Sequence, residues 1–191
     1  MKNDLFVDFL LEYNKKVNLV SRQSTRETLV CLVAETLFLK KFVSTPLIVD
    51  AGSGGGLLGI PLAISFPEKK VILSEPNHKK IYFLKQALRL LNLANVEIFE
   101  GPIQEFMHHH DRYESTMIAR GFPKIEVLAE YVYKKKFKEL ILVTSVNKIN
   151  KIQNKVANIR QNLYNMPLRN NLIIFKLENV SRETQKKWVK S

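Results

Sequence analysis

The chain of 191 residues contains only one cysteine, Cys31. A single thiol excludes an internal disulfide and fits a reducing compartment, so we expect a cytoplasmic protein. Cys31 lies within an apolar helical pattern and has no paired histidine nearby in the sequence. We therefore interpret it as a small core residue rather than a nucleophile.

Long apolar runs are also missing. No stretch reaches the length of a membrane span, and residues 1–5 lack the apolar region and cleavage site of a secretory signal. We therefore expect no membrane partner. The hydrophobic content of 46% is nevertheless enough to fill a core, and the length suits one compact unit with a small appendage.

Acidic residues are scarce from Lys134 onward. The formal net charge is +12, and this last segment carries fourteen Lys and Arg residues against three acids, which leaves +11 of the +12 there. A basic segment on a folded domain suggests a polyanionic partner, most simply RNA. The alternative is a lysine-rich face that only contacts solvent.

Glycine is rare, yet five of the seven glycines fall within residues 52–59. This stretch follows an apolar run, Leu47 to Val49, that ends in Asp50, and an apolar helical pattern comes after it. Glycines allow positive φ angles and let a ligand lie against bare backbone, while the next helix presents free N–H groups. We call residues 50–59 the glycine cradle and predict that it binds a cofactor.

Two cofactor classes use such a turn. Gly54-x-Gly56-x-x-Gly59 matches the dinucleotide fingerprint. The acid at the strand end, in Asp50-x-Gly52-x-Gly54-x-Gly56, looks instead like motif I of class I S-adenosylmethionine (SAM) methyltransferases. SAM is cationic at sulfur and has no pyrophosphate, so an acid suits it better. A glycine-rich turn without a ligand is the remaining alternative.

Helical periodicity fills the first forty residues. The second of two helices starts at Ser24 as the N-cap, with Glu27 completing a capping box, and runs to about Leu39. We expect residues 1–42 to form a small helical cap on a SAM-binding domain of residues 43–191.

Strands and helices alternate after the cap. We predict strands at 47–50, 71–75, 96–99, 115–119, 138–144 and 171–177, and helices up to 66, over 79–91, from 101 and over 148–160. The segment 162–169 is ambiguous and fits a further strand. The alternation predicts an α/β fold with a parallel, doubly wound sheet and right-handed crossovers.

Candidate site residues follow successive strands, so they should gather at one edge of the sheet. Glu75 lies 25 positions after Asp50, where an acid can accept both ribose hydroxyls of an adenosine cofactor, although it could also be an ordinary exposed acid. Arg120 can hold the cofactor carboxylate or a nearby phosphate through a bidentate contact, and we predict a catalytic role for it. The predicted cofactor-binding residues are Asp50, Gly52, Ser53, Gly54, Gly56, Leu57, Glu75, Ile103, Gln104 and Arg120.

The run of three histidines, residues 108–110, invites a metal site. Adjacent side chains on a helix point in different directions, and no third ligand completes a zinc set. We expect a solvated helix end and no metal.

Several motifs occur in a fixed order between residues 10 and 125. They are Asn14…Asn18-Leu19, Glu35-Thr36-Leu37, the cradle, Glu75…Lys79-Lys80-Ile81, Asn95-Val96, Gln104-Glu105-Phe106 and Ala119-Arg120-Gly121-Phe122. Their order and spacing are similar to those of the RsmG (GidB) methyltransferases. This resemblance implies methylation of N7 of a guanine in the 530 loop of bacterial 16S rRNA, with SAM as cofactor and with 16S rRNA or the small ribosomal subunit as partner. We expect the protein to be a monomer.

The resemblance also implies roles for single residues. The family's SAM-contacting positions match Gly52, Leu57, Ile103, Gln104 and Arg120, and its acidic strand ends match Asp50 and Glu75. The family's Arg-His and Asp-Ser in the second helix are here Cys31-Leu32 and Glu35-Thr36.

Guanine N7 is a lone-pair acceptor without a proton, so its methylation needs no general base. Tyr13 and Phe122 are candidates for stacking on the target base, or are core residues. The alternatives are a SAM-dependent enzyme for another nucleic-acid base or a small molecule, and a non-catalytic RNA-binding relic of the fold.

Overall fold

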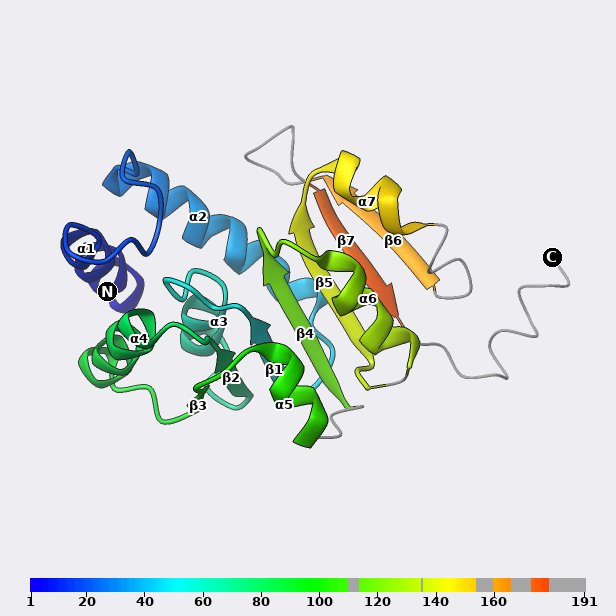
Figure 1. Ribbon diagram of the computed structural model, residues 1–191. Helices are drawn as coiled ribbons and strands as arrows, with labels where there is room; N and C mark the ends of the chain where they lie inside the picture. Colours follow the sequence, from blue (N-terminus) through cyan, green and yellow to red (C-terminus); the bar gives the residue numbers. More distant parts are fainter. Residues whose placement is uncertain (110–113, 135, 154–159, 166–172, 179–191) are drawn as a thin grey trace, which may run out of the picture.

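The computed structural model describes residues 1–109, 114–134, 136–153, 160–165 and 173–178 (Figure 1). At its centre is one seven-stranded sheet with the strand order β3-β2-β1-β4-β5-β7-β6. The strands are β1 (Leu47–Ala51), β2 (Lys70–Ser74), β3 (Val96–Phe99), β4 (Ser115–Arg120), β5 (Glu139–Thr144), β6 (Arg160–Asn165) and β7 (Ile173–Glu178).

The strand directions confirm most of the predicted sheet. β1 to β5 pair in parallel. The prediction of an entirely parallel sheet is wrong at β7, which runs antiparallel to both β5 and β6. Only residues 166–172 separate β6 from β7. A parallel crossover needs a dozen or more residues, so these two strands can only pair as antiparallel neighbours.

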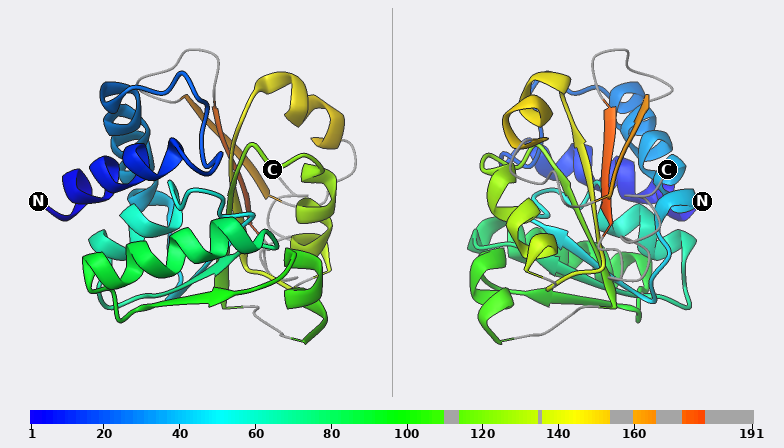
Figure 2. Two further views of the ribbon diagram at one scale, coloured as in Figure 1. Left: turned by 60° about the vertical axis from the view of Figure 1, so that its left-hand side comes forward. Right: turned by 90° about the vertical axis from the view of Figure 1, so that its right-hand side faces the viewer.

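Helices cover both faces of the sheet (Figure 2). One face carries α1 to α4, and the other carries α5 to α7. The helical elements are α1 (Lys2–Asn14), α2 (Arg26–Phe38), the 3₁₀ helix η1 (Leu39–Phe42), α3 (Gly59–Ser65), α4 (His78–Leu91), α5 (Ile103–His109), α6 (Ile125–Tyr133) and α7 (Val146–Gln153).

Two hydrophobic cores lie on opposite sides of the sheet. Ile48 of β1 packs in the core beneath α1 to α4, and its neighbour Val49 packs in the core beneath α5 to α7. Successive side chains of a strand point to opposite faces, so both need an apolar partner. This explains why the central strands are continuous apolar runs.

Two local predictions in the second helix are wrong. The N-cap is Thr25 and not Ser24, because the Thr25 side chain accepts a hydrogen bond from the backbone N–H of Thr28. Cys31 is exposed, not part of the core. It lies two positions beyond the buried Leu29, which is more than half a turn around the helix.

The end of the chain also differs from prediction. The expected basic helix over 148–160 is α7 over Val146–Gln153, and Arg160 instead begins strand β6. The residues between them lie outside the described part of the chain. Helix α6 was not predicted, whereas β6 and β7 lie at the ambiguous segment and at the predicted last strand.

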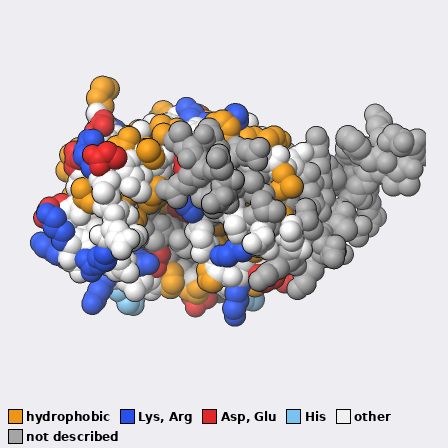
Figure 3. All heavy atoms as spheres, turned by 90° about the horizontal axis from the view of Figure 1, so that it is seen from above, with side chains coloured by type: hydrophobic (Ala, Val, Ile, Leu, Met, Phe, Trp, Pro, Cys, Tyr) orange, Lys and Arg blue, Asp and Glu red, His pale blue; other side chains and the backbone are white. Residues whose placement is uncertain are grey.

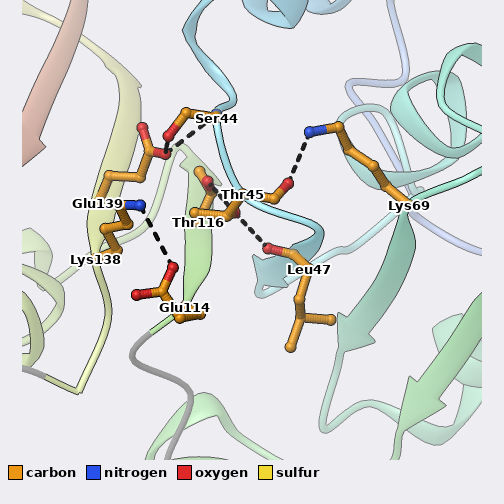
Figure 4. A network of polar contacts seen from close by, with 8 residues as sticks. All are labelled: Ser44, Thr45, Leu47, Lys69, Glu114, Thr116, Lys138 and Glu139. Carbon is orange, nitrogen blue, oxygen red and sulfur yellow. Dashed lines mark hydrogen bonds and ion pairs between the residues drawn. The ribbon is translucent and has the colours of Figure 1, made fainter.

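A polar network closes the amino edge of the sheet, where β1, β4 and β5 begin (Figure 4). Glu139, at the start of β5, is 1% exposed and accepts hydrogen bonds from the backbone N–H and hydroxyl of Ser44. The Thr45 and Thr116 hydroxyls lie 2.7 Å apart. Lys69 donates to the Thr45 carbonyl at 2.7 Å. The segment that joins η1 to β1 is therefore held to three neighbouring elements.

Candidate active site

The glycine cradle folds over the carboxyl ends of β1 and β2. Backbone N–H groups of Gly52 and Ser53 donate to the Ser74 carbonyl at 2.9 and 3.0 Å. Gly52, Gly54 and Gly56 have φ angles of +72°, +57° and +73°, a region that side chains with a Cβ rarely adopt. These glycines are therefore required for the turn itself.

The glycines differ in what surrounds them. A Cβ at Gly59 would lie 2.2 Å from Leu73 Cδ2, so this glycine allows α3 to pack closely on β2. A Cβ at Gly54 would meet nothing closer than the Gly52 carbonyl at 3.9 Å. Gly54 thus faces open space, which leaves room for a ligand against the backbone of the cradle. This observation fits an adenosine cofactor bound there.

Asp50 connects the two ends of the cradle. Its side chain is 2% exposed, and Oδ2 accepts a hydrogen bond from the Gly59 N–H at 3.0 Å. Burial raises the pKa of Asp50 to about 7, while hydrogen bonds from Gly59 and Ser53 and the nearby Arg120 cation act in the opposite direction. Asp50 therefore fixes the first turn of α3 to the end of β1.

Glu75 lies directly after β2 and is 5% exposed. Its Oε2 accepts from the Gly54 N–H at 2.8 Å, and its Oε1 accepts from the Asn77 N–H at 2.9 Å. The two contacts join the cradle to the start of α4. A carboxylate offers about four lone-pair positions, so these bonds still permit the predicted contact with ribose hydroxyls.

The segment after β3 lies beside the cradle. Ser74 Oγ donates to the Gly101 carbonyl at 2.9 Å and ties this segment to the end of β2. α5 then begins at Ile103, which is buried, and Gln104 is half-buried. Both predicted residues therefore lie at the same edge of the sheet as Glu75 and the cradle.

Arg120 is the last residue of β4, and its Nη2 lies 3.3 Å from Glu35 Oε2. The Glu35 side chain is fully buried, and that of Arg120 is 18% exposed. Glu35 belongs to α2, so the predicted catalytic arginine contacts the helical cap. Sequence reasoning did not assign Glu35 to the site. The available signal was an acid next to Thr36 within an otherwise apolar helical pattern.

The N-terminal helices also contact the cradle directly. Thr36 Oγ1 donates to the Leu57 carbonyl at 2.8 Å. A Cβ at Gly55 would lie 3.1 Å from Leu10 Cδ1 and 3.4 Å from Leu19 Cβ. The cradle is therefore packed between the sheet and the first helices.

The family model described as "GidB: rRNA small subunit methyltransferase G" matches residues 2–167. The chain belongs to this family. The match includes the helical cap, the cradle and the strand ends after β2, β3 and β4.

Relatives in the GidB family support the assignment. "Ribosomal RNA small subunit methyltransferase G" of Brachyspira hyodysenteriae is 34% identical over 93% of this chain and 84% of its own length. The protein of the same name from Hydrogenovibrio crunogenus is 30% identical over 67% of this chain, and that match spans 58% of the relative. Similarity to it therefore covers less than two thirds of that protein.

Solved structures confirm the fold. A SAM-dependent methyltransferase from Aquifex aeolicus superposes with a TM-score of 0.59 at 14% identity, over 79% of this chain and 92% of its own. The fold is that of the class I SAM methyltransferases, as the cradle motif predicted, and SAM is the cofactor implied for this GidB family member.

The two predicted stacking residues have different surroundings. The Tyr13 ring packs against Phe9 and Phe83 at 5.7 and 5.1 Å between centroids, within the core beneath α1 and α4. Phe122 lies over the cradle, because its Cδ2 would be 3.4 Å from a Cβ at Gly52. Of the two residues, only Phe122 therefore lies beside the glycine cradle.

Several predicted features lie elsewhere or outside the described residues. His110 belongs to the undescribed part, and the described residues contain no group of three or more His, Cys, Asp or Glu side chains that could hold a metal. None of the described helices is long and apolar enough to cross a membrane. Lys134, at the end of α6, pairs with Glu130 at 2.7 Å. α6 leads from the end of β4 to the start of β5 (Figure 1), where the Lys138 N–H donates to the Ser115 carbonyl at 3.2 Å. Lys134 follows the last turn of α6, so it lies toward the amino edge of the sheet.

Proposed function

We propose that this chain is a SAM-dependent methyltransferase that methylates N7 of a guanine in the 530 loop of 16S rRNA. The observation that carries the proposal is a glycine cradle with an open side at Gly54, flanked by Glu75 and Arg120, in a chain of the GidB family. The relatives' names supply the class of RNA, and the resemblance of the motifs supplies the target atom.

The cofactor site would be built from four segments at the carboxyl edge of the sheet. SAM, when bound, supplies an electrophilic methyl group. The backbone of residues 52–57 would lie against the cofactor, Glu75 would accept the ribose hydroxyls, and Ile103 and Gln104 would border the adenine. Arg120 would hold the carboxylate, for which a planar guanidinium is well suited.

The proposed reaction requires the protein to align the reactants, and it requires no proton transfer. Guanine N7 has a free lone pair, so no general base is required. Holding the reacting atoms in line and excluding water can contribute about 7–11 kcal/mol in favourable cases. Asp50 is not placed to act as a base, because its carboxyl group is buried and its Oδ2 accepts the Gly59 N–H.

The RNA would approach the carboxyl edge of the sheet. Figure 3 shows this edge from above, with Lys and Arg side chains spread along the part where α1 and α4 lie. Lys16 and Lys79 are exposed, and Lys80 is half-buried. Among the described residues, no acid forms an ion pair with these three lysines. Cations at the start of α4 oppose the helix dipole, so they do not stabilise that helix and instead suit phosphate groups of RNA.

We further propose that residues 1–42 act as a cap that supports the cradle, and that the protein works as a cytoplasmic monomer on 16S rRNA or the small subunit. Thr36, Leu10 and Leu19 provide the supporting contacts on the cradle.

The direct test is methyl transfer from labelled SAM to small ribosomal subunits and to naked 16S rRNA. We expect label in one guanine of the 530 loop and none in an RNA that carries 7-deazaguanine there, because that analogue lacks N7. Equal labelling of the two RNAs would contradict the proposed target atom. Labelling of a different base would contradict the proposed site on the RNA.

A further inference from the structure

A fully buried carboxylate links the helical cap to the arginine of the cofactor site. Glu35 of α2 is 0% exposed, and its Oε2 lies 3.3 Å from Arg120 Nη2. The two residues are 85 positions apart in the chain, and one comes from the cap while the other ends β4. This ion pair therefore joins two parts of the fold at the site.

Stability alone does not explain this pair. Burying a carboxylate has a large desolvation cost, and replacing a buried ion pair by apolar residues of similar volume is often neutral or stabilising. Leu29 and Val33 of α2 are buried in the hydrophobic core, whereas Glu35 lies two positions beyond Val33, more than half a turn around the helix. Its burial is therefore separate from that core, and an apolar residue at position 35 would avoid the desolvation cost of the carboxylate.

The surroundings of Arg120 indicate what the pair does. Arg120 Nη2 lies 3.3 Å from Glu35 of the cap, and the positive charge of Arg120 also favours the charged form of Asp50 in the glycine cradle. Thr36, the residue after Glu35, bonds to the Leu57 carbonyl of the cradle at 2.8 Å. α2 is therefore held in register with the cradle at the point where Glu35 contacts Arg120.

We propose that Glu35 is a positioning residue that orients Arg120 toward the cofactor. A guanidinium carries five N–H donors in a rigid fork, so a carboxylate that holds one end also sets the direction of the other donors. Glu35 thereby prepares Arg120 to receive the carboxylate of SAM. This inference rests on the proposed cofactor site.

The test measures SAM affinity by calorimetry and thermal unfolding of the protein without ligand. The variants of the full chain are Glu35→Gln, Arg120→Met and the double variant E35Q/R120M. Asp8→Asn is the matched control. Asp8 is also a carboxylate of the cap that pairs with an arginine, Arg26, at 2.7 Å, but its side chain is exposed and its partner belongs to the cap itself.

We expect Glu35→Gln to weaken SAM binding by about tenfold or more, the order of one charge-assisted hydrogen bond, and Asp8→Asn to leave it unchanged. In the Arg120→Met background, Glu35→Gln should cause no further loss of affinity, because Glu35 acts through Arg120. In that background Glu35→Gln should instead raise the unfolding temperature, since it removes a buried charge that has lost its Arg120 partner. The comparison of Arg120→Met with the double variant can be made even if the single variant Glu35→Gln does not fold.

Two results would contradict the positioning role of Glu35 and leave the proposed function intact. The first is that Glu35→Gln lowers the unfolding temperature but leaves SAM affinity unchanged, which would make Glu35 merely structural. The second is an equal loss of affinity in the wild-type and Arg120→Met backgrounds, which would mean that Glu35 does not act through Arg120. Failure of the wild-type chain to bind SAM would instead overturn the proposed function and this inference together.

Discussion

Gly54 has the backbone conformation and the free space that a cofactor-facing residue needs. Its φ angle is +57°, and a Cβ there would meet no atom closer than 3.9 Å. We predict that Gly54→Val abolishes SAM binding, because a branched side chain would occupy the ligand's space and disfavour positive φ. Calorimetry with SAM and with NAD checks this. Binding of NAD but not SAM by the wild-type chain would contradict the cofactor assignment.

Asp50 makes the stability of the protein dependent on pH. Its raised pKa, about 7 in the folded chain, means that the folded state holds a proton that the unfolded state has lost. Its contribution to stability is therefore present below pH 4 and is lost as the pH rises to about 7, at up to ~1.4 kcal/mol per pH unit. Asn can still accept the Gly59 hydrogen bond but does not titrate.

We therefore predict that Asp50→Asn is least favourable relative to wild type at pH 4 and becomes progressively more favourable up to pH 7. Urea unfolding of both proteins without ligand, across this range, provides the measurement. A stability difference that stays constant with pH would show that Asp50 is not buried in its acid form.

Among the secondary-structure elements, strands could be predicted wherever the sequence contains a local apolar run. β1 to β5 overlap predicted segments, and the turn after β1 was predictable because its glycines are adjacent in sequence. The antiparallel direction of β7 was not predicted, since it depends on the shortness of the connection from β6. Likewise, the Glu35–Arg120 contact joins residues from distant elements, so no local pattern could reveal it.

β7 is fixed beside β5 by an ion pair within the sheet. Lys176 Nζ lies 2.8 Å from Glu139 Oε2, and their side chains are 10% and 1% exposed. We predict that Lys176→Met destabilises the fold by about 3–5 kcal/mol, because it leaves the Glu139 carboxylate buried without this partner. Lys138→Met is the matched control. Its pair with Glu114, at 3.4 Å, is exposed, and we expect a loss below about 1 kcal/mol.

Chemical denaturation of the two lysine variants gives these values. Adding Glu139→Leu to Lys176→Met should recover most of the lost stability, because the uncompensated charge is removed with its partner. Equal losses of unfolding free energy in Lys176→Met and Lys138→Met would show that burial of the Lys176–Glu139 pair does not make its loss more destabilising.

On the scale of the whole molecule, basic residues lie at both edges of the sheet, but the proposed cofactor site lies at one edge only. Lys79 and Lys80 lie in the first turn of α4, close in sequence to Glu75, whereas Lys134 follows α6, which leads to the start of β5 at the amino edge. We predict that reversing Lys134, Lys135 and Lys136 weakens RNA binding across sequences and lowers its salt dependence, with SAM affinity unchanged. Each lost phosphate contact on a single strand reduces the slope of log K against log salt by about 0.7.

Reversal of Lys79 and Lys80 is the companion experiment. It should lower the salt slope in the same way and also reduce methyl transfer at saturating RNA, because these lysines lie at the edge where the target base must enter. If the triple variant keeps both its RNA affinity and its salt slope, the lysines at 134–136 form only a solvated face. RNA contact would then come from the carboxyl edge.

The proposed methylation of guanine N7 in small-subunit rRNA is tested most directly in cells. 7-Methylguanine is mapped across the 16S rRNA of cells that contain the protein and of cells that lack it. We expect one 7-methylguanine in the 530 loop that disappears without the protein and returns with the wild-type chain, but not with Gly54→Val. An unchanged map in cells that lack the protein would rule out the proposed activity.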